Sequence, residues 1–340
     1  MGLFGETSTV QKPAGVTAMP TAFSAPSSKD SLAQVGLRTG GRRLQAAKSA
    51  TGGVLTILLQ GEKDSSKTAS LAGLAARRPP GTRFVIASFD DTTRLSLENY
   101  YGAEWVEKNV EVYEMTRRQV LPDGSIYRGY DPNDPSTAEA VLGEFYLLLD
   151  ELEKDGKVWG FVVDHFQSFY EQVCKSYAAH VAGYSSTAQL EIKDWGVRTD
   201  TATKVETKTR RIVTIDGGIV AITGYAPEEK IVVKKVPDGK GGTKTQVTRE
   251  VTAPKWLKDD LKRNWLVLLH SRVVRSGNET TNTTTSLAKD TYTIEVLTSK
   301  VRRFPKGAVV DITGSSLAKF WDPETVGALQ DLADKMEATA

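Results

Sequence analysis

The stretch from Val54 to Leu71, which reads VLTILLQGEKDSSKTASL, constrains the fold more than any other part of the chain. It begins as an apolar run typical of a buried strand, passes through a short polar loop, and ends in an Ala/Leu-rich segment that favours a helix. A loop that joins a strand to a helix in this way can direct backbone N–H groups at phosphate oxygens. We therefore expect an α/β fold with a phosphate-binding loop.

The loop sequence GEKDSSKT carries most of the pattern G-x-x-x-x-G-K-[ST]. Lys67 is expected to contact the β- and γ-phosphates of ATP, and the hydroxyl of Thr68 to bind Mg²⁺. Ser66 stands where the pattern requires glycine, and serine takes a positive φ less readily. Either the loop keeps its shape with Ser66 in an ordinary conformation, or nucleotide binding is weakened. The predicted nucleotide-binding residues are Gly61, Glu62, Lys63, Asp64, Ser65, Ser66, Lys67 and Thr68.

Two adjacent acids follow the next predicted buried strand, Arg83–Ser88. Ligands of open α/β sheets bind at the carboxyl ends of the strands, so Asp90 or Asp91 is a candidate general base that polarises an attacking water. The competing interpretation is an N-cap for the following helix, a position that Asp favours strongly.

A second anchor is the apolar run Val158–Asp164, VWGFVVD, which closes on a single Asp. A Walker B strand has this form, and Asp164 would complete the Mg²⁺ octahedron begun by Thr68. His165 follows directly, and a lone histidine there is more often a structural hydrogen-bonding group than a catalyst. The next strand, Ile219–Thr223, is expected to end near the γ-phosphate, with Thr223 or Tyr225 as the sensing group.

The rest of the chain continues the alternation of strands and helices. Further strands are predicted at Val110–Met115, Trp265–Val274, Thr291–Lys300 and Ala308–Thr313, and an exposed loop at Thr116–Pro135. Ser136 is expected to cap an amphipathic helix that reaches about Lys154. The segment from Phe166 to Ile215 reads as helical with a break at Asp194–Gly196, and a last helix is predicted at Pro323–Met336.

Composition places the chain among soluble globular proteins, since 39% of its 340 residues are hydrophobic and 25% are charged. Its apolar runs fall short of the ~20 residues that cross a membrane, and its first residues lack the layout of a signal peptide. The single cysteine, Cys174, fits a reducing compartment, so we expect a cytoplasmic protein. With three histidines and one cysteine, a zinc site is not expected.

Positive charge gathers in two segments. Residues 1–50 hold six Lys or Arg against two acids and few large apolar side chains, which indicates a flexible basic arm. A predicted β-hairpin within residues 228–252 is also basic and could contact a nucleic-acid backbone. Its candidate residues are Lys230, Lys234, Lys235, Lys240, Lys244 and Arg249. The alternatives are a solvated tail without a partner and a hairpin whose lysines keep it soluble.

The order of these motifs resembles that of the RecA-like ATPases, and more narrowly the phage-encoded RecA-like nucleotide-binding proteins of the Sak-type single-strand-annealing group. The resemblance runs from about Val54 to Thr313 and rests on GEKDSSKT, FVIASFDD, VWGFVVD, the DWG segment, GIVAITGY, residues 254–258 and a terminal Lys-x-Arg hairpin. It implies that Lys300 and Arg302 reach the nucleotide of a neighbouring subunit, and that residues 165–168 and the basic hairpin lie near DNA. The chain departs from the pattern of that group at Ser66 and at Gly224-Tyr225.

The predicted organisation is an arm (1–50), an ATPase domain (51–321) with a mobile hairpin tip at 275–291, and a C-terminal helical segment (322–340). The fold class is α/β, a mostly parallel sheet flanked by helices with antiparallel C-terminal strands. The expected function is an ATP- and Mg²⁺-dependent ring or filament that acts on single-stranded DNA, in a prokaryotic or phage-infected cell. The alternatives are a regulatory, KaiC-like ATPase without a DNA partner, and a structural protein with a degenerate phosphate loop.

Overall fold

The computed structural model describes residues 53–62, 65–226, 230–237, 243–250, 264–274, 291–314 and 316–338, with backbone alone for 230–237, 243–250, 274 and 337. Eight strands form one sheet in the order β12-β11-β10-β1-β7-β6-β2-β3. The strands are β1 (Leu55–Gly61), β2 (Arg83–Ser88), β3 (Glu111–Glu114), β6 (Val158–Asp164), β7 (Ile219–Tyr225), β10 (Val267–Val274), β11 (Thr291–Ser299) and β12 (Val309–Asp311).

All pairings from β3 through β10 are parallel, whereas β10–β11 and β11–β12 are antiparallel. The predicted mostly parallel sheet with antiparallel C-terminal strands is therefore confirmed. Because parallel strands end at the same edge, Gly61 at the end of β1 pairs with Tyr225 on β7, and Ser88 at the end of β2 pairs with Asp164 on β6. The segments that follow these strands thus lie at one edge of the sheet.

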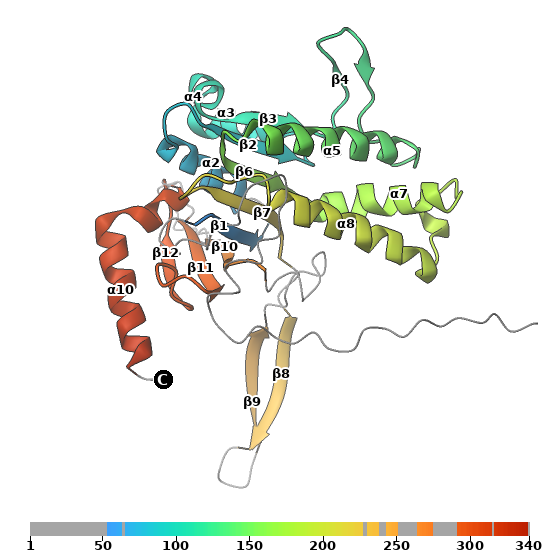
Figure 1. Cartoon of the computed structure of the whole chain (residues 1–340). Coiled ribbons are helices and arrows are strands. Elements are labelled where there is room, and N and C mark those ends of the chain that lie inside the picture. Colours follow the sequence, from blue (N-terminus) through green and yellow to red (C-terminus); the bar gives the residue numbers. More distant parts are fainter. Residues whose placement is uncertain are drawn as a thin grey trace, which may run out of the picture. The chain divides into compact units, whose positions relative to one another are not determined.

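Helices cover both faces of the sheet (Figure 1). On one face α5 (Thr137–Asp155), the π-helical segment Phe169–Val173, α7 (Cys174–Val181) and α8 (Trp195–Thr209) pack a core that includes Phe145 and Phe161. The other face holds α2 (Lys67–Ala72), the 3₁₀ segment η2 (Gly73–Arg77), α3 (Thr93–Tyr101), α4 (Ala103–Asn109), η6 (Leu317–Trp321) and α10 (Pro323–Glu337). Alternate residues of β1 face opposite cores, since Leu58 joins the first and Ile57 and Leu59 the second.

Most predicted elements lie within a residue or two of their expected bounds. Strands β2 and β6 match fully, and α8 begins at Trp195, inside the predicted break. Ser136 occupies the predicted N-cap position of α5, but its hydroxyl accepts no N–H of the helix and instead donates to Asp134 Oδ1 at 2.6 Å. Its backbone is already helical, with φ of −66° and ψ of −26°, whereas a capping serine takes an extended conformation.

The predicted loop at 116–135 contains a short hairpin, β4 (Gln119–Val120) and β5 (Ile126–Tyr127), that the sequence analysis missed. The basic hairpin is confirmed as β8 (Lys230–Pro237) and β9 (Thr243–Glu250), a separate two-stranded sheet. Short helical turns at α6 (Phe166–Ser168), η4 (Thr187–Gln189) and η5 (Ile192–Asp194) complete the elements of the described ranges. The arm (1–50), residues 254–258 and most of the tip at 275–291 lie outside them.

Within the described part of the chain, no helix combines the length and the apolar character that crossing a bilayer requires.

Candidate functional site

Asp164 is the centre of the site, because side chains from four elements meet at its carboxylate. Thr68 of α2 donates to Oδ1 at 2.7 Å, and Thr223 of β7 donates to the same oxygen at 2.5 Å. Thr93 of α3 donates to Oδ2 at 3.0 Å, with Ser88 of β2 at 3.4 Å. The carboxylate is fully buried, and these hydrogen-bond donors are neutral hydroxyls.

The structure thus brings together Thr68 and Asp164, the two predicted Mg²⁺ ligands, which stand 96 positions apart in the sequence. A buried carboxylate is costly unless a positive charge or good hydrogen bonds compensate it. Mg²⁺ in nucleotide sites uses one or two carboxylates, a hydroxyl, water and substrate phosphates, and this pair supplies the protein's part of that set. The residues present therefore fit the cation.

Lys67 lies at the mouth of the loop, with only 6% of its surface exposed. Its ammonium donates to the carbonyl of Glu62 at 2.5 Å, and it lies 3.4 Å from both the Gly61 carbonyl and Ser65 Oγ. The ring of Tyr225 lies 4.7 Å from the same nitrogen. An ammonium group held at the mouth of a loop in this way can donate hydrogen bonds to a terminal phosphate. Lys63 and Asp64, also predicted here, lie outside the described residues.

Ser66 takes a left-handed backbone conformation, which glycine adopts more readily than serine. Its φ of 57° and ψ of 26° lie in the left-handed region. The expectation that the loop keeps its shape with Ser66 in an ordinary conformation is therefore wrong. Close packing holds the loop from outside: a Cβ on Gly61 would stand 2.5 Å from the Ser271 carbonyl oxygen, and Ser271 Oγ donates to the carbonyl of Ser65. Because these contacts hold Gly61 and Ser65 in place, the strained backbone conformation of the turn falls on Ser66.

Asp90 and Asp91, the two candidate bases, differ in their surroundings. Asp91 is exposed and accepts a hydrogen bond from Thr116 Oγ1 at 2.6 Å. Asp90 is partly buried; its Oδ1 accepts from the N–H and hydroxyl of Thr92, while its Oδ2 faces His165 Nε2 at 3.3 Å. Thr92 occupies the N-cap position of α3, so neither acid is the cap residue itself. Asp90 is the acid that faces the site.

A cavity of about 590 Å³ opens beside this group, lined among others by Asp90, Asp91, His165 and Tyr225. Tyr225 lies edge-on to the imidazole of His165, with 5.3 Å between ring centroids. Thr223, the other predicted sensing residue, is fully buried behind Asp164 and accepts the backbone N–H of His165 at 3.0 Å. Of the two predicted sensors, Tyr225 therefore reaches the cavity, and Thr223 holds Asp164.

Lys300 and Arg302 lie at the opposite edge of the sheet. Val267 pairs with Ile57 near the start of β1 and with Ser299 at the end of β11, and the Lys300 N–H donates to the Leu266 carbonyl at 2.8 Å. Ile57 lies four strand residues, about 13 Å, before Gly61 at the other end of β1. Arg302 forms an ion pair with Asp334 of α10. Neither residue belongs to the loop that holds Lys67 in its own chain, and their role toward a neighbour stays a prediction.

The predicted nucleic-acid residues lie on the basic hairpin, whose backbone alone is described. The register sets Lys230 opposite Glu250, Lys234 opposite Gln246, Lys235 opposite Thr245, Lys244 opposite Val236 and Arg249 opposite Ile231. Lys240 lies outside the described residues. The predicted contact with nucleic acid stays a prediction.

Ser88, Thr93 and the role of His165 were missed by sequence reasoning. Ser88 closes the buried strand RFVIAS, and Thr93 follows the FDD segment. A hydroxyl at the last position of a buried strand is a usable signal, because the neighbouring strand end supplies its partner. Thr93 carries no such signal, since only the path of α3 brings it to Asp164.

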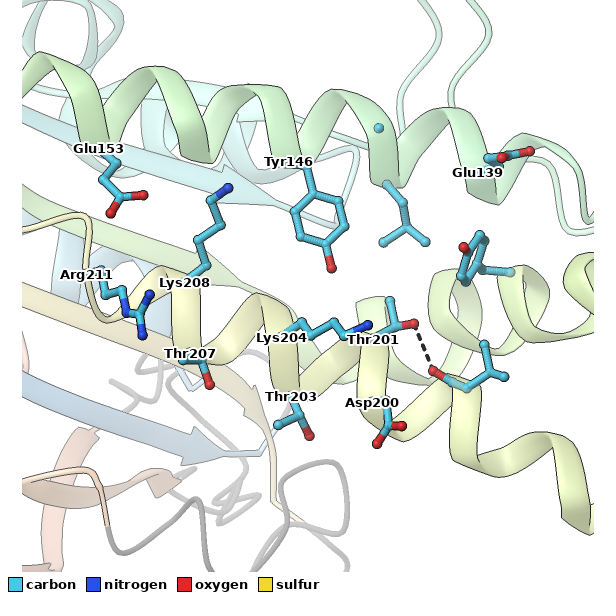
Figure 2. A pocket seen from close by; sticks show the side chains of 14 residues that line it. Glu139, Tyr146, Glu153, Asp200, Thr201, Thr203, Lys204, Thr207, Lys208 and Arg211 are labelled. Atoms are coloured by element: carbon cyan, nitrogen blue, oxygen red, sulfur yellow. Dashed lines mark hydrogen bonds between the residues drawn. The ribbon is translucent and has the colours of Figure 1, made fainter. Parts of the chain in front are cut away.

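A larger cavity, of about 910 Å³, lies between α5 and α8 (Figure 2) and contains none of the residues described above. Figure 2 shows the ring of Tyr146 and the chain of Lys204 entering the space between the two helices. Its cations, Lys204, Lys208 and Arg211, are matched by as many acids, Glu139, Glu153 and Asp200. This balance favours no charged ligand.

No protein-family model matches the chain, and no curated protein matches it.

Proposed function

We propose that this chain binds ATP with Mg²⁺ and hydrolyses it, as a RecA-like protein that assembles into oligomers and acts on single-stranded DNA. The single observation that carries the proposal is the 2.7 Å hydrogen bond from Thr68 to Asp164. It joins the phosphate-loop helix to the tip of the Walker B strand, as a shared Mg²⁺ site requires. The order of the motifs along the chain supports the RecA-like assignment.

Each residue of the site has a role in this proposal. When ATP binds, the Lys67 ammonium leaves the carbonyls of Gly61 and Glu62 and contacts the β- and γ-phosphate oxygens. Thr68 and Asp164 would hold Mg²⁺. Mg²⁺ supplies positive charge next to the phosphate oxygens when it is bound. Asp90 accepts the proton of the attacking water, because its Oδ2 lies 3.3 Å from His165, the residue that follows Asp164, whereas Asp91 accepts a hydrogen bond from Thr116. Tyr225, which contacts Lys67 and reaches the cavity, senses the terminal phosphate.

Two features support the oligomer and the DNA partner. Lys300 and Arg302 stand at the edge of the sheet opposite the phosphate loop of their own chain, so a role toward nucleotide would have to be toward that of a neighbouring subunit. The β8–β9 hairpin follows the sensor strand β7 and carries the basic residues already named. Phosphate neutralisation by such residues supplies most of the affinity in sequence-independent DNA binding.

The proposal is tested by ATP hydrolysis measured with and without single-stranded DNA, at low and at moderate salt. We expect hydrolysis that DNA stimulates, a loss of at least tenfold in Lys67→Ala and Thr68→Ala, and no change in Lys154→Ala, an exposed lysine of α5. Replacing 230–250 with a short glycine linker is expected to abolish DNA binding and leave the basal rate intact.

The outcomes separate the three hypotheses. Hydrolysis without any DNA response would favour a regulatory ATPase. If nucleotide binding and oligomerisation are the same in Lys67→Ala as in the natural chain, a structural protein with a degenerate loop is the better account.

A further inference from the structure

His165 stands between the two carboxylates of the candidate site. Its Nε2 lies 3.3 Å from Asp90 Oδ2 and 3.9 Å from Asp164 Oδ2. The ring is mostly buried, with 15% of the side chain exposed, and the edge-on ring of Tyr225 packs against it. The imidazole therefore lies within 4 Å of both carboxylates.

The backbone of His165 is held as firmly as its ring. Its φ of 56° and ψ of 42° lie in the left-handed region, and its N–H donates to Thr223 Oγ1, which in turn donates to Asp164. A side-chain-bearing residue stays in this sparsely populated conformation only where its surroundings determine it. The direction in which the imidazole leaves the end of β6 is therefore set by the same hydrogen bonds that hold Asp164.

Asp90 has two sets of contacts, one on each carboxylate oxygen. Thr92 donates to Oδ1 from its backbone and its hydroxyl, and both groups are exposed. Oδ2 faces His165, and both residues line the same cavity. The contact with His165 thus holds the second oxygen, as the Thr92 hydrogen bonds hold the first, and a general base works only when its oxygen is within reach of the water's proton.

We propose that His165 is a positioning residue for hydrolysis: by contacting Asp90 Oδ2 it holds that carboxylate toward the attacking water and away from Asp164. The inference rests on the proposed function and adds to it a residue that acts through Asp90. If Asp90 is displaced, proton transfer slows while nucleotide binding is unchanged. Loss of the His165 contact should therefore lower kcat and leave KM nearly unchanged.

The test is steady-state ATP hydrolysis by the full chain with four variants. His165→Asn tolerates the left-handed backbone but is too short to reach Asp90, whereas His165→Gln extends an amide donor toward it. We expect His165→Asn to lower kcat about 10- to 100-fold with KM within twofold, and His165→Gln to recover a measurable part of the loss. Asp90→Asn alone and combined with His165→Asn should give equal rates, because the histidine acts only through the acid.

Several results would overturn the inference. An unchanged kcat in His165→Asn, a loss confined to KM, or a further fall in the double variant would each contradict it. If His165→Asn melts well below the natural chain, His165→Gly, which suits the positive φ, takes its place with the same expected kcat and KM. A natural chain that hydrolyses no ATP overturns the proposed hydrolysis and this inference together, whereas normal hydrolysis in both His165 variants overturns this inference alone.

Discussion

Ser66 and His165 are the non-glycine residues with positive φ in the described part of the chain, and both border Asp164 or its partner Thr68. Such conformations cost roughly 1–3 kcal/mol each and gather at functional sites. At Ser66 a serine holds a conformation that glycine would take without strain. The departure from the glycine pattern therefore costs stability.

Replacing Ser66 with glycine tests this interpretation. Glycine takes φ near 57° without strain, so we expect Ser66→Gly to raise the free energy of unfolding by about 0.5–1 kcal/mol, the left-handed cost less the extra entropy of glycine. Urea unfolding measures the change. Ser65→Gly is the matched control, since Ser65 is buried and hydrogen-bonded to the Glu62 carbonyl, and it should destabilise. A Ser66→Gly chain no more stable than the natural one would contradict the assigned conformation.

The hydroxyl of Thr223 serves two groups at once, the buried carboxylate of Asp164 and the partly buried N–H of His165. Thr223→Val keeps the shape but leaves both without that partner, so a loss of about 1–3 kcal/mol of unfolding free energy is expected. Thr298→Val makes the same exchange at an exposed position of β11 and should change stability by less than about 0.5 kcal/mol. Similar values for the two variants in denaturant unfolding would show that Thr223 is not holding Asp164.

At the scale of elements, the sequence predicts what local patterns determine. Strands β2 and β6 are apolar runs with polar ends, and their bounds and the placement of Asp164 follow from that. The short β4–β5 hairpin has no run long enough to be recognised. The choice between Asp90 and Asp91 could not be made either, because it depends on Thr116 and His165, residues that only the fold brings near.

The packing of β6 on β2 gives a test at this scale. A Cβ at Gly160 would stand 2.2 Å from a ring carbon of Phe84, whereas a Cβ at Gly143 of α5 meets nothing within 4 Å. We expect Gly160→Ala to destabilise the fold by about 1–3 kcal/mol through overpacking, and Gly143→Ala to stabilise it by up to about 1 kcal/mol through helix propensity. Thermal unfolding of the two variants checks this. A Gly160→Ala chain as stable as the natural one would contradict the β2–β6 register.

At the scale of the molecule, one apolar core joins the helices α5, α7 and α8 to the sheet, and Cys174 lies within it. Burial raises the pKa of the Cys174 thiol well above its usual value. Because the thiol's pKa is higher in the folded than in the unfolded chain, its effect on the free energy of unfolding is fully present below the unfolded pKa, about 8.5. As the pH rises from there through the folded pKa, the unfolded chain loses the thiol proton more readily, and the free energy of unfolding should fall.

Because the chain has one cysteine, thiol labelling reports on this core directly. At pH 8 we expect Cys174 to resist a thiol reagent in the folded protein and to react at once in denaturant, with a labelling rate that follows global unfolding. Tyr177→Ala, beside the same core, should speed labelling in proportion to the stability it removes. Rapid labelling of the folded natural chain would contradict a closed core at α7.

The most direct measurement is calorimetric titration of ATP into the purified chain, with and without Mg²⁺, for the natural sequence, Lys67→Ala and Thr68→Ala. Lys67, Thr68 and Asp164 meet at one edge of the sheet, so we expect saturable binding that Mg²⁺ strengthens. Lys67→Ala should weaken it at least tenfold, and Thr68→Ala should remove most of the Mg²⁺ dependence. Absence of ATP binding by the natural chain, or equal affinity in all three proteins, would contradict a nucleotide site at this loop.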